Sequence, residues 1–452
     1  MIRSSEDTIA AIATAPGEGA ISVIRISGRE AFAIAQKIFT GPVATFLTHT
    51  AHYGKITSDE GLTLDSVLLL VMRGPRSYTG EDSVEISCHG GSLVTRRVLE
   101  RIVEAGARPA EPGEFSLRAY LNGKIDLAQA EAIQQLIGAK NEMALETAER
   151  QLEGALSKTI AQFQKELTDI AAILEAWVDF PEEDLEFATM DELCTGLEAI
   201  GLRMQRLQAT FHNGKMLHQG ISLCLLGSPN VGKSSLMNAL LGFDRAIVTP
   251  IAGTTRDLLE EDLTLGDLHF RLVDTAGIRV TEEIIEQEGI RRSQKAMEEA
   301  DLVLLLLDAT RALSEHDHHL LRSVPRAKTI LVWNKIDVRE PVDSLAWEPS
   351  VQISAKERLG LNDLQRAIET VIWKQGPPSK EEVVITRQRH FAALSNAIAS
   401  ILAVVSGLKQ NVSAEFVASD LRNALHELGT IIGTNVTEDI LSAIFSKFCL
   451  GK

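Results

Sequence analysis

The residues with the clearest chemistry form a glycine-rich segment that matches the pattern Gly-x-x-x-x-Gly-Lys-Ser at residues 227–234. An apolar run at 221–226 precedes it and a helical pattern at 234–241 follows, which is the context of a phosphate-binding loop. Backbone N–H groups of such a loop and the following helix N-terminus bind a polyanion. We expect Lys233 to reach the outer phosphates, as a catalytic candidate, and Ser234 to ligate Mg²⁺. The nucleotide contacts predicted here are Asn230, Val231, Gly232, Lys233, Ser234 and Ser235.

Four further signatures follow in the order of a GTP-binding domain, at 253–257, 274–277, 334–337 and 354–356. With the phosphate loop and apolar runs at 270–273, 302–307 and 331–333, they predict a doubly wound, Ras-like α/β domain. Asp337 favours guanine, because a carboxylate can accept from both N1–H and the exocyclic amine, a donor pair that adenine lacks. We expect Asn334 to support the base edge and the Lys335 stem to pack on it. The residues predicted to contact the base are Asn334, Lys335, Asp337, Ser354, Ala355 and Lys356.

Two segments are expected to respond to the nucleotide. Thr255 would join Ser234 on Mg²⁺ directly and Asp274 through water, while the Gly277 N–H would sense the γ-phosphate. The order of residues 249–257 and 274–290 should therefore depend on the nucleotide. The contacts predicted from these segments are Thr249, Pro250, Ile251, Ala252, Gly253, Thr254, Thr255, Asp274, Thr275, Ala276 and Gly277.

The glutamine that orients the attacking water in Ras-like switches is replaced here by Ile278, so catalytic help must come from elsewhere. One candidate is a potassium ion held by the Asn230 amide oxygen and by carbonyls of 249–254. It would neutralise developing charge as an arginine finger does, a gain of about 10³–10⁵-fold in known cases. The other candidate is the acidic run Glu282, Glu283, Glu286 and Glu288, which residue type alone interprets better as a solvated face.

Length and composition predict several domains and a particular compartment. The 452 residues are enough for about three domains, and the net charge of −17 argues against nucleic-acid binding through bulk electrostatics. Four scattered cysteines suit a reducing compartment without disulfides or structural zinc. No signal core and no bilayer-spanning stretch are expected, which predicts a cytoplasmic protein.

Around the GTPase signatures, the pattern predicts two further domains. Residues 1–119 carry short strands at 21–26, 67–71 and 84–86 and a helix at 93–105, typical of an α/β domain. Apolar residues at spacings of three and four predict one long helix over 145–177, ended by Pro181, and another at 191–211. We expect 120–215 and 380–452 to form one discontinuous helical bundle, with the GTPase domain, 216–379, inserted after its first part.

Glycine, proline and single charges cluster three times in the N-terminal domain, at 16–19, 78–82 and 112–115. Such clusters fit plain turns as well as a small-ligand site, and residue type alone favours turns.

From end to end, the chain resembles the bacterial MnmE (TrmE) family of tRNA-modification GTPases. Besides the GTPase series, the resemblance rests on residues 19–28, 79–91, 112–116 and 124–131 and on the ending Phe448-Cys449-Leu450-Gly451-Lys452. The family ending has isoleucine where this chain has Leu450, a conservative change. The resemblance to the family implies an N-terminal domain similar to folate-dependent one-carbon enzymes and a homodimer formed through that domain. It also implies cooperation with the flavoprotein MnmG (GidA) in a heterotetramer or larger complex that modifies C5 of the wobble uridine in certain tRNAs.

The resemblance also implies roles for single residues. A tetrahydrofolate cofactor, in the 5-formyl or 5,10-methylene form, would be held by Arg25, Glu85, Lys124 and Lys452. Whether Cys449 is a nucleophile or a small residue of that pocket stays open. Glu286 would orient the attacking water. The implied potassium ligands are Asn230, Thr249, Ile251 and Thr254.

Three functional interpretations follow. The leading one is a potassium-activated GTPase whose cycle gates tRNA modification. One alternative is a regulatory GTPase of ribosome assembly or stress signalling, with the N-terminal domain only a dimerisation module. Another is a folate-binding scaffold with a vestigial GTPase, which the intact Lys233, Ser234, Thr255 and Asp337 oppose.

Overall fold

The computed structural model describes residues 7–179, 189–242, 262–266, 268–273, 297–373, 376, 378–379 and 381–452. The chain forms two compact units. The first combines Met1–Ile137, Glu149–Met204 and Ala392–Lys452, and the second combines Gly138–Ala148 with Gln205–Phe391. An insertion into a discontinuous unit was expected from the sequence. The predicted division into three domains with boundaries at 119, 215 and 379 stays a prediction.

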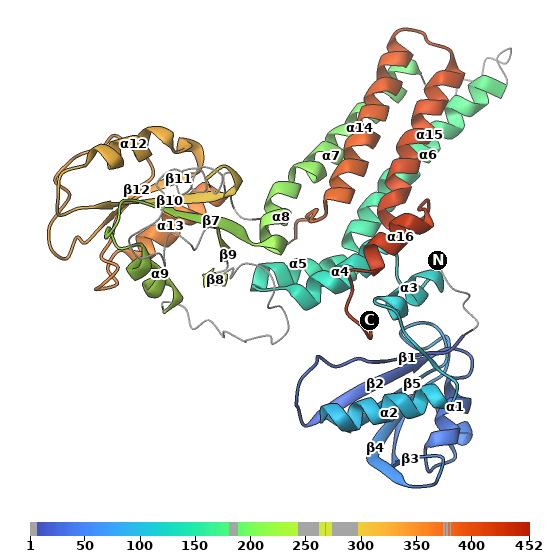
Figure 1. Cartoon of the computed structure of the whole chain (residues 1–452). Coiled ribbons are helices and arrows are strands. Elements are labelled where there is room, and N and C mark those ends of the chain that lie inside the picture. Colours follow the sequence, from blue (N-terminus) through green and yellow to red (C-terminus); the bar gives the residue numbers. More distant parts are fainter. Residues whose placement is uncertain are drawn as a thin grey trace. The chain divides into compact units, whose positions relative to one another are not determined.

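A six-stranded sheet of order β3-β4-β5-β2-β1-β6 begins the first unit (Figure 1). Its strands are β1 Ile9–Ile12, β2 Ile21–Ser27, β3 Thr50–Thr57, β4 Thr63–Met72, β5 Ser83–His89 and β6 Arg108–Pro109. Along β2, Ile24 and Ile26 are fully buried while Arg25 between them turns to the opposite face. The buried face packs on helices α1, Ala31–Ile38, and α2, Ser92–Glu104, so the expected α/β domain is confirmed.

Helices make up the rest of the first unit. They are α3 Glu114–Leu121, α4 Leu127–Gly138, α5 Glu142–Leu152, α6 Ala155–Asp179, α7 Met190–Ala209, α14 Gln388–Lys409, α15 Ala414–Ile432 and α16 Glu438–Phe445, of which α4, α5, α7 and α14 run into the second unit. The expectation of one continuous helix over 145–177 is wrong, because the chain breaks at Gly154, whose φ of +85° no helix interior adopts. The apolar stripe continues across the break, which is why the pattern hid it. Pro181 lies outside the described residues.

Among the described residues, α14 is the helix long and apolar enough to cross a membrane by length and composition, contrary to the expectation that no stretch would be. Its buried residues Leu394, Ala397, Ile401 and Val404 recur at helical spacing and face the interior of the first unit. A buried core helix passes the same test, so the finding is weak support for a membrane span.

The second unit contains a sheet of order β12-β11-β10-β7-β9-β8, parallel except for the β8–β9 hairpin. Its elements are α8 Phe211–Gln219, β7 Ile221–Leu226, α9 Lys233–Leu241, β8 Asp262–Leu265, β9 Leu268–Val273, β10 Leu302–Asp308, α12 Glu315–Ser323, β11 Thr329–Asn334, β12 Ser350–Gln352 and α13 Leu361–Ile372. Alternate residues of β10 enter two different cores, Leu304 one and Leu305 the other. Both faces of the sheet are therefore covered, which confirms the doubly wound fold.

Candidate functional site

The glycine-rich segment connects β7 to α9, as its pattern predicts. Gly227 has a φ of +146°, and a Cβ there would lie 2.5 Å from the Leu306 carbonyl oxygen. Gly232 has a φ of +104°, and a Cβ there would overlap the Asn334 side-chain amide. Only glycine fits either position, which leaves the backbone open to a phosphate. Asn230 between them adopts the left-handed region at φ +59°.

Lys233 folds back over this loop. Its Nζ donates to the carbonyl oxygens of Gly227 at 2.6 Å and Ser228 at 3.1 Å. Burial lowers the pKa of the Lys233 ammonium. The cation is thus held at the centre of the loop, where an anion would gain most from it.

Asn334, at the end of β11, ties three of the predicted signatures together. Its Nδ2 donates to the Val231 carbonyl at 2.9 Å, and its Oδ1 accepts from the Ala355 N–H at 3.0 Å. The side chain is nearly fully buried. The phosphate loop, the 334–337 signature and the 354–356 signature therefore share one hydrogen-bonded junction. Asp337, three residues after Asn334, is exposed.

Lys335 has a partner that sequence reasoning missed. Its Nζ lies 2.6 Å from Oδ2 of Asp308, the last residue of β10. Burial raises the pKa of the Asp308 carboxyl, but hydrogen bonds from Lys335 and Thr310 outweigh it and hold that pKa below its ordinary value. A signal for the position of Asp308, though not for its pairing with Lys335, was available, since a carboxylate that ends an otherwise apolar strand lies at the carboxyl edge of the sheet, where ligands bind.

Several predicted site residues cannot be placed. Asp274, Glu286 and the whole 249–257 segment lie outside the described residues. The remaining base-end residues are placed: Ser354 is fully buried and its Oγ accepts from the Glu357 N–H, while Lys356 is exposed beside Glu357.

A second candidate site lies in the N-terminal domain. Arg25 and Glu85 are direct partners on β2 and β5, and their side chains pair at 2.8 Å. The Arg25 guanidinium lies 5.3 Å from the Tyr78 ring centroid and 5.6 Å from that of Phe115. These rings hold the cation in one orientation.

The end of the chain docks beside Arg25. The Gly451 carbonyl accepts from Arg25 Nη1 at 3.3 Å, and the Lys452 carbonyl accepts from the Phe115 N–H at 3.2 Å. Burial, and then the charge of Arg25, lowers the pKa of the Lys452 ammonium. Arg25, Glu85 and Lys452 are thus brought together. Lys124 instead donates to the Pro75 carbonyl at 2.9 Å, and Cys449 is exposed.

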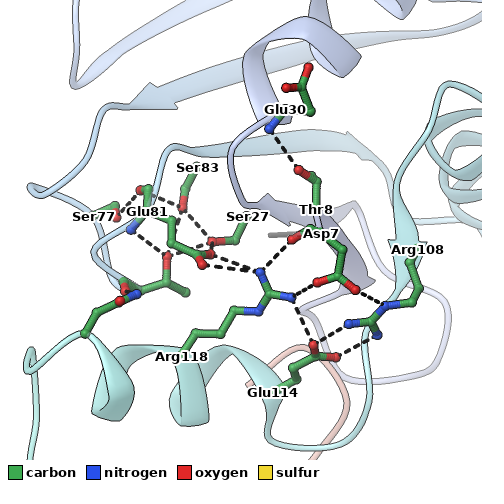
Figure 2. A network of polar contacts seen from close by, with 12 residues as sticks. Asp7, Thr8, Ser27, Glu30, Ser77, Glu81, Ser83, Arg108, Glu114 and Arg118 are labelled. Atoms are coloured by element: carbon green, nitrogen blue, oxygen red, sulfur yellow. Dashed lines mark hydrogen bonds and ion pairs between the residues drawn. The ribbon is translucent and has the colours of Figure 1, made fainter. Parts of the chain in front are cut away.

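A cluster of five charged side chains is hydrogen-bonded together in the same domain (Figure 2). We call Asp7, Glu81, Arg108, Glu114 and Arg118 the clamp. Arg118 donates to the Asp7 carboxylate at 2.6 Å, to Glu114 at 3.1 Å and to Glu81 at 3.3 Å. Arg108 bonds Asp7 at 2.8 Å and Glu114 at 2.6 Å. The charged residues of two glycine-containing segments, 78–82 and 112–115, therefore have a structural role, because Glu81 and Glu114 form ion pairs within the domain.

Comparisons with known proteins identify matches to both the N-terminal domain and the rest of the chain. A family model described as the MnmE helical domain matches residues 127–449, and one described as the GTP-binding protein TrmE N-terminus matches 8–124. A tRNA modification GTPase MnmE of Protochlamydia amoebophila is 60% identical over 99% of this chain and 98% of its own. The chain belongs to the MnmE family. It is therefore a GTPase of the kind that acts in tRNA modification.

A more distant MnmE-family relative, the tRNA modification GTPase MnmE of Clostridioides difficile, is 42% identical over 99% of both chains. Among solved structures, the G domain of the T. maritima FeoB iron transporter is 29% identical and covers 33% of this chain and 98% of that chain. Its TM-score of 0.26 is too low to support a structural argument. The resemblance to the MnmE family drawn from the sequence is confirmed.

Proposed function

We propose that this chain is a potassium-activated GTPase that, with the flavoprotein MnmG, modifies C5 of the wobble uridine in certain tRNAs. The group added would be carboxymethylaminomethyl or aminomethyl, with a tetrahydrofolate supplying the one-carbon unit. One observation carries the proposal: the last residues, Gly451 and Lys452, dock beside Arg25 and Glu85. A chain that only switched on GTP would not need Arg25 and Lys452 gathered beside one carboxylate.

For the nucleotide, the Asn334 junction supports a GTP site. It holds the loop that would bind the phosphates and the segment that would bind the base at one fixed spacing. In this proposal Lys233 binds the outer phosphates and Asp337 selects guanine. Mg²⁺ would be held by Ser234 and Thr255, with Asp274 behind a water.

Potassium and Glu286 complete the hydrolytic site in this proposal. Asn230 has a left-handed backbone at φ +59°, a conformation that is uncommon outside glycine and concentrates at ligand-binding sites. The carbonyls of Thr249 and Ile251 and the side of Thr254 would complete the cage. Glu286 would position the attacking water that Ile278 cannot position.

For the folate, the residues present fit the group. A tetrahydrofolate carries a glutamate tail with carboxylates, and Arg25 and Lys452 supply two cations for acceptors of this kind. Glu85 and the fully buried Phe115 ring keep Arg25 oriented, and the partly exposed Tyr78 ring lies beside the same guanidinium. The bound group would supply the one-carbon unit. Lys124 and Cys449 belong to this proposal only through the family pattern.

The N-terminal sheet supports a homodimer. Tyr53 on β3 and Leu68 on β4 are cross-strand partners that are 76% and 49% exposed, and Ile21 on β2 is 64% exposed. Their face also carries Arg25 and Glu85, so a second copy would close over the folate pocket. The negative net charge suits a tRNA grip shared with MnmG, and a cytoplasmic location is part of the same proposal.

Binding of 5-formyl-tetrahydrofolate to the full chain, measured by calorimetry, tests the proposal. We expect binding by the wild type, loss in Arg25→Ala and no change in Arg96→Ala, whose side chain pairs with Glu100 on the exposed face of α2. Indifference to folate would favour the regulatory-GTPase alternative.

The GTPase part is tested by turnover in KCl and in NaCl. We expect faster turnover in KCl for the wild type and no cation dependence in Asn230→Ala. Nucleoside analysis of tRNA from cells lacking the protein tests the last part. If the wobble uridine of those cells still carries its usual modification, the tRNA assignment is wrong.

A further inference from the structure

The second residue of the phosphate loop, Ser228, makes a contact that loop chemistry does not require. Its side chain is 5% exposed, and its Oγ donates to Asp317 Oδ1 at 2.6 Å. Asp317 lies in the first turn of α12, 89 residues further along the chain, and is 1% exposed. A buried carboxylate is costly unless it is fully hydrogen-bonded, so this position calls for a physical explanation.

Helix capping explains only half of the Asp317 side chain. Oδ2 accepts from the Ser314 N–H at 2.9 Å and from Ser314 Oγ at 2.6 Å, while the Asp317 N–H bonds Ser314 Oγ at 3.2 Å. This is a capping box, and Arg311 pairs with the same Oδ2 at 3.0 Å. A cap of this kind works with an exposed carboxylate. Oδ1 takes no part in it and is directed at the loop.

The Ser228 backbone is where several loop contacts meet. Its carbonyl oxygen accepts from Lys233 Nζ at 3.1 Å and from the Val231 N–H at 3.4 Å. A side chain fixed to Asp317 therefore fixes a carbonyl that orients both the loop lysine and the turn before Gly232. Burial raises the pKa of the Asp317 carboxyl, but the Ser228 and Ser314 hydrogen bonds outweigh it, so the group stays a charged acceptor.

We propose that Asp317 is a positioning residue for the nucleotide: through Ser228 it holds the phosphate loop in its binding shape before GTP arrives. The inference rests on the proposed use of residues 227–234 as the GTP site. Its physical basis is preorganisation, because a loop already ordered by α12 loses less conformational freedom on binding. GDP and GTP should benefit alike, since both use this loop.

The test measures the dissociation constants of fluorescent GDP and GTP analogues with the full-length chain. We expect Ser228→Ala to raise both constants about 10-fold, equivalent to about 1.4 kcal/mol. Asp317→Asn should raise them similarly. The double variant should be no worse than Ser228→Ala, because Asp317 acts only through the lost hydroxyl.

Ser314→Ala is the matched control, since it weakens the α12 cap but leaves the Ser228–Asp317 bond. It should lower thermal stability without changing nucleotide affinity. The proposal is overturned if Ser228→Ala leaves affinity within about 2-fold, if the two effects add in full, or if Ser314→Ala weakens binding equally. Lys233→Ala distinguishes failure of the proposed GTP site from failure of the role proposed for Asp317. If Lys233→Ala binds the nucleotides as tightly as the wild type, residues 227–234 are not the GTP site and the proposed function is wrong.

Discussion

Removing Arg118 should expose how much of the N-terminal domain depends on the clamp. The clamp holds two cations and three carboxylates, and Arg118→Met leaves Arg108 as the one cation among them. Arg118 is 5% exposed, and its partners Glu114, Glu81 and Asp7 are 12%, 14% and 35% exposed. Breaking a buried pair by removing one partner costs about 3–5 kcal/mol. Because Asp7 is partly solvated, we expect the lower end, about 3 kcal/mol.

The stability difference between wild type and Arg118→Met should depend on pH. Burial raises the pKa values of Asp7 and Glu114, but their hydrogen bonds to Arg108 and Arg118 outweigh it and hold both below their ordinary values. A group whose pKa is lower in the folded state stabilises the fold at a pH above its unfolded pKa, about 4 here. This stability is lost as the pH falls through the folded pKa. The difference between wild type and Arg118→Met should therefore be full at neutral pH and shrink below about pH 4.

Cys88 offers a local probe for this measurement. It lies in β5, 2% exposed in the N-terminal core, and burial raises the pKa of its thiol, so it should react only when the sheet opens. The fraction labelled by a thiol reagent in a brief pulse at each urea concentration, read by peptide mass spectrometry, gives the opening free energy. Cys224 in β7 belongs to the other unit, and its transition should not move.

Arg96→Met is the matched control for the clamp. Arg96 and Glu100 form an exposed pair at 3.7 Å, so its loss should cost no more than about 0.5 kcal/mol. Equal shifts in the two variants would refute the clamp as a major stabiliser. A shift for Arg118→Met that is as large at pH 3.5 as at pH 7 would refute the electrostatic explanation.

Three further predictions concern Gly451 near the end of the chain, Leu68 on the exposed face of the N-terminal sheet, and His218 in the second unit. Gly451→Ala should weaken 5-formyl-tetrahydrofolate binding more than 10-fold by calorimetry and leave GTP turnover unchanged, since φ is +86° and a Cβ would overlap the β1 backbone. Leu68→Glu should convert a dimer to a monomer in analytical ultracentrifugation, because it places a charge beside the exposed apolar ring of Tyr53. Burial, and then Arg387, lowers the pKa of His218 to about 4, so the second unit should lose stability as pH falls from about 6.5. His218→Gln should flatten that loss, measured by Cys224 labelling in urea.

Four strands of the GTPase sheet were predictable because their signals are local. β7, β9 and β11 contain short apolar runs next to a polar signature, and β10 is almost entirely apolar, whereas β8 and β12 have no such run. The Asn334 junction follows from the same rule, since parallel strands bring their carboxyl ends to one edge. What could not be predicted is Asp308 as the partner of Lys335 and Asp317 as the partner of Ser228. Those pairs depend on which loop packs on which, and a carboxylate after a strand or in a first helical turn has many other uses.

The N-terminal domain was harder to predict for two reasons. The strands β1 and β3 lack a long apolar run, because β1 has four residues and β3 alternates exposed with partly buried positions. By residue type alone, the segments containing Glu81 and Glu114 fit turns as well as a small-ligand site, and neither interpretation indicates ion pairs. Arg118 meets Asp7 across 111 positions of sequence and Glu81 across 37, and no local pattern reports such pairs.

Helix α3 connects the clamp to residues 451–452 at the end of the chain. Glu114 and Arg118, one turn apart, face the clamp, while the intervening Phe115 offers its N–H to the last residue of the chain. The turn before α3 leaves no freedom to adjust, because Gly113 has a φ of +70° and a Cβ there would overlap the Phe445 carbonyl of α16. The first turn of α3 is thus fixed by ion pairs on one side and by the C-terminal helix on the other. A change in the clamp removes one of these two restraints, so we expect it to loosen the Phe115 N–H and the Lys452 carbonyl that accepts from it.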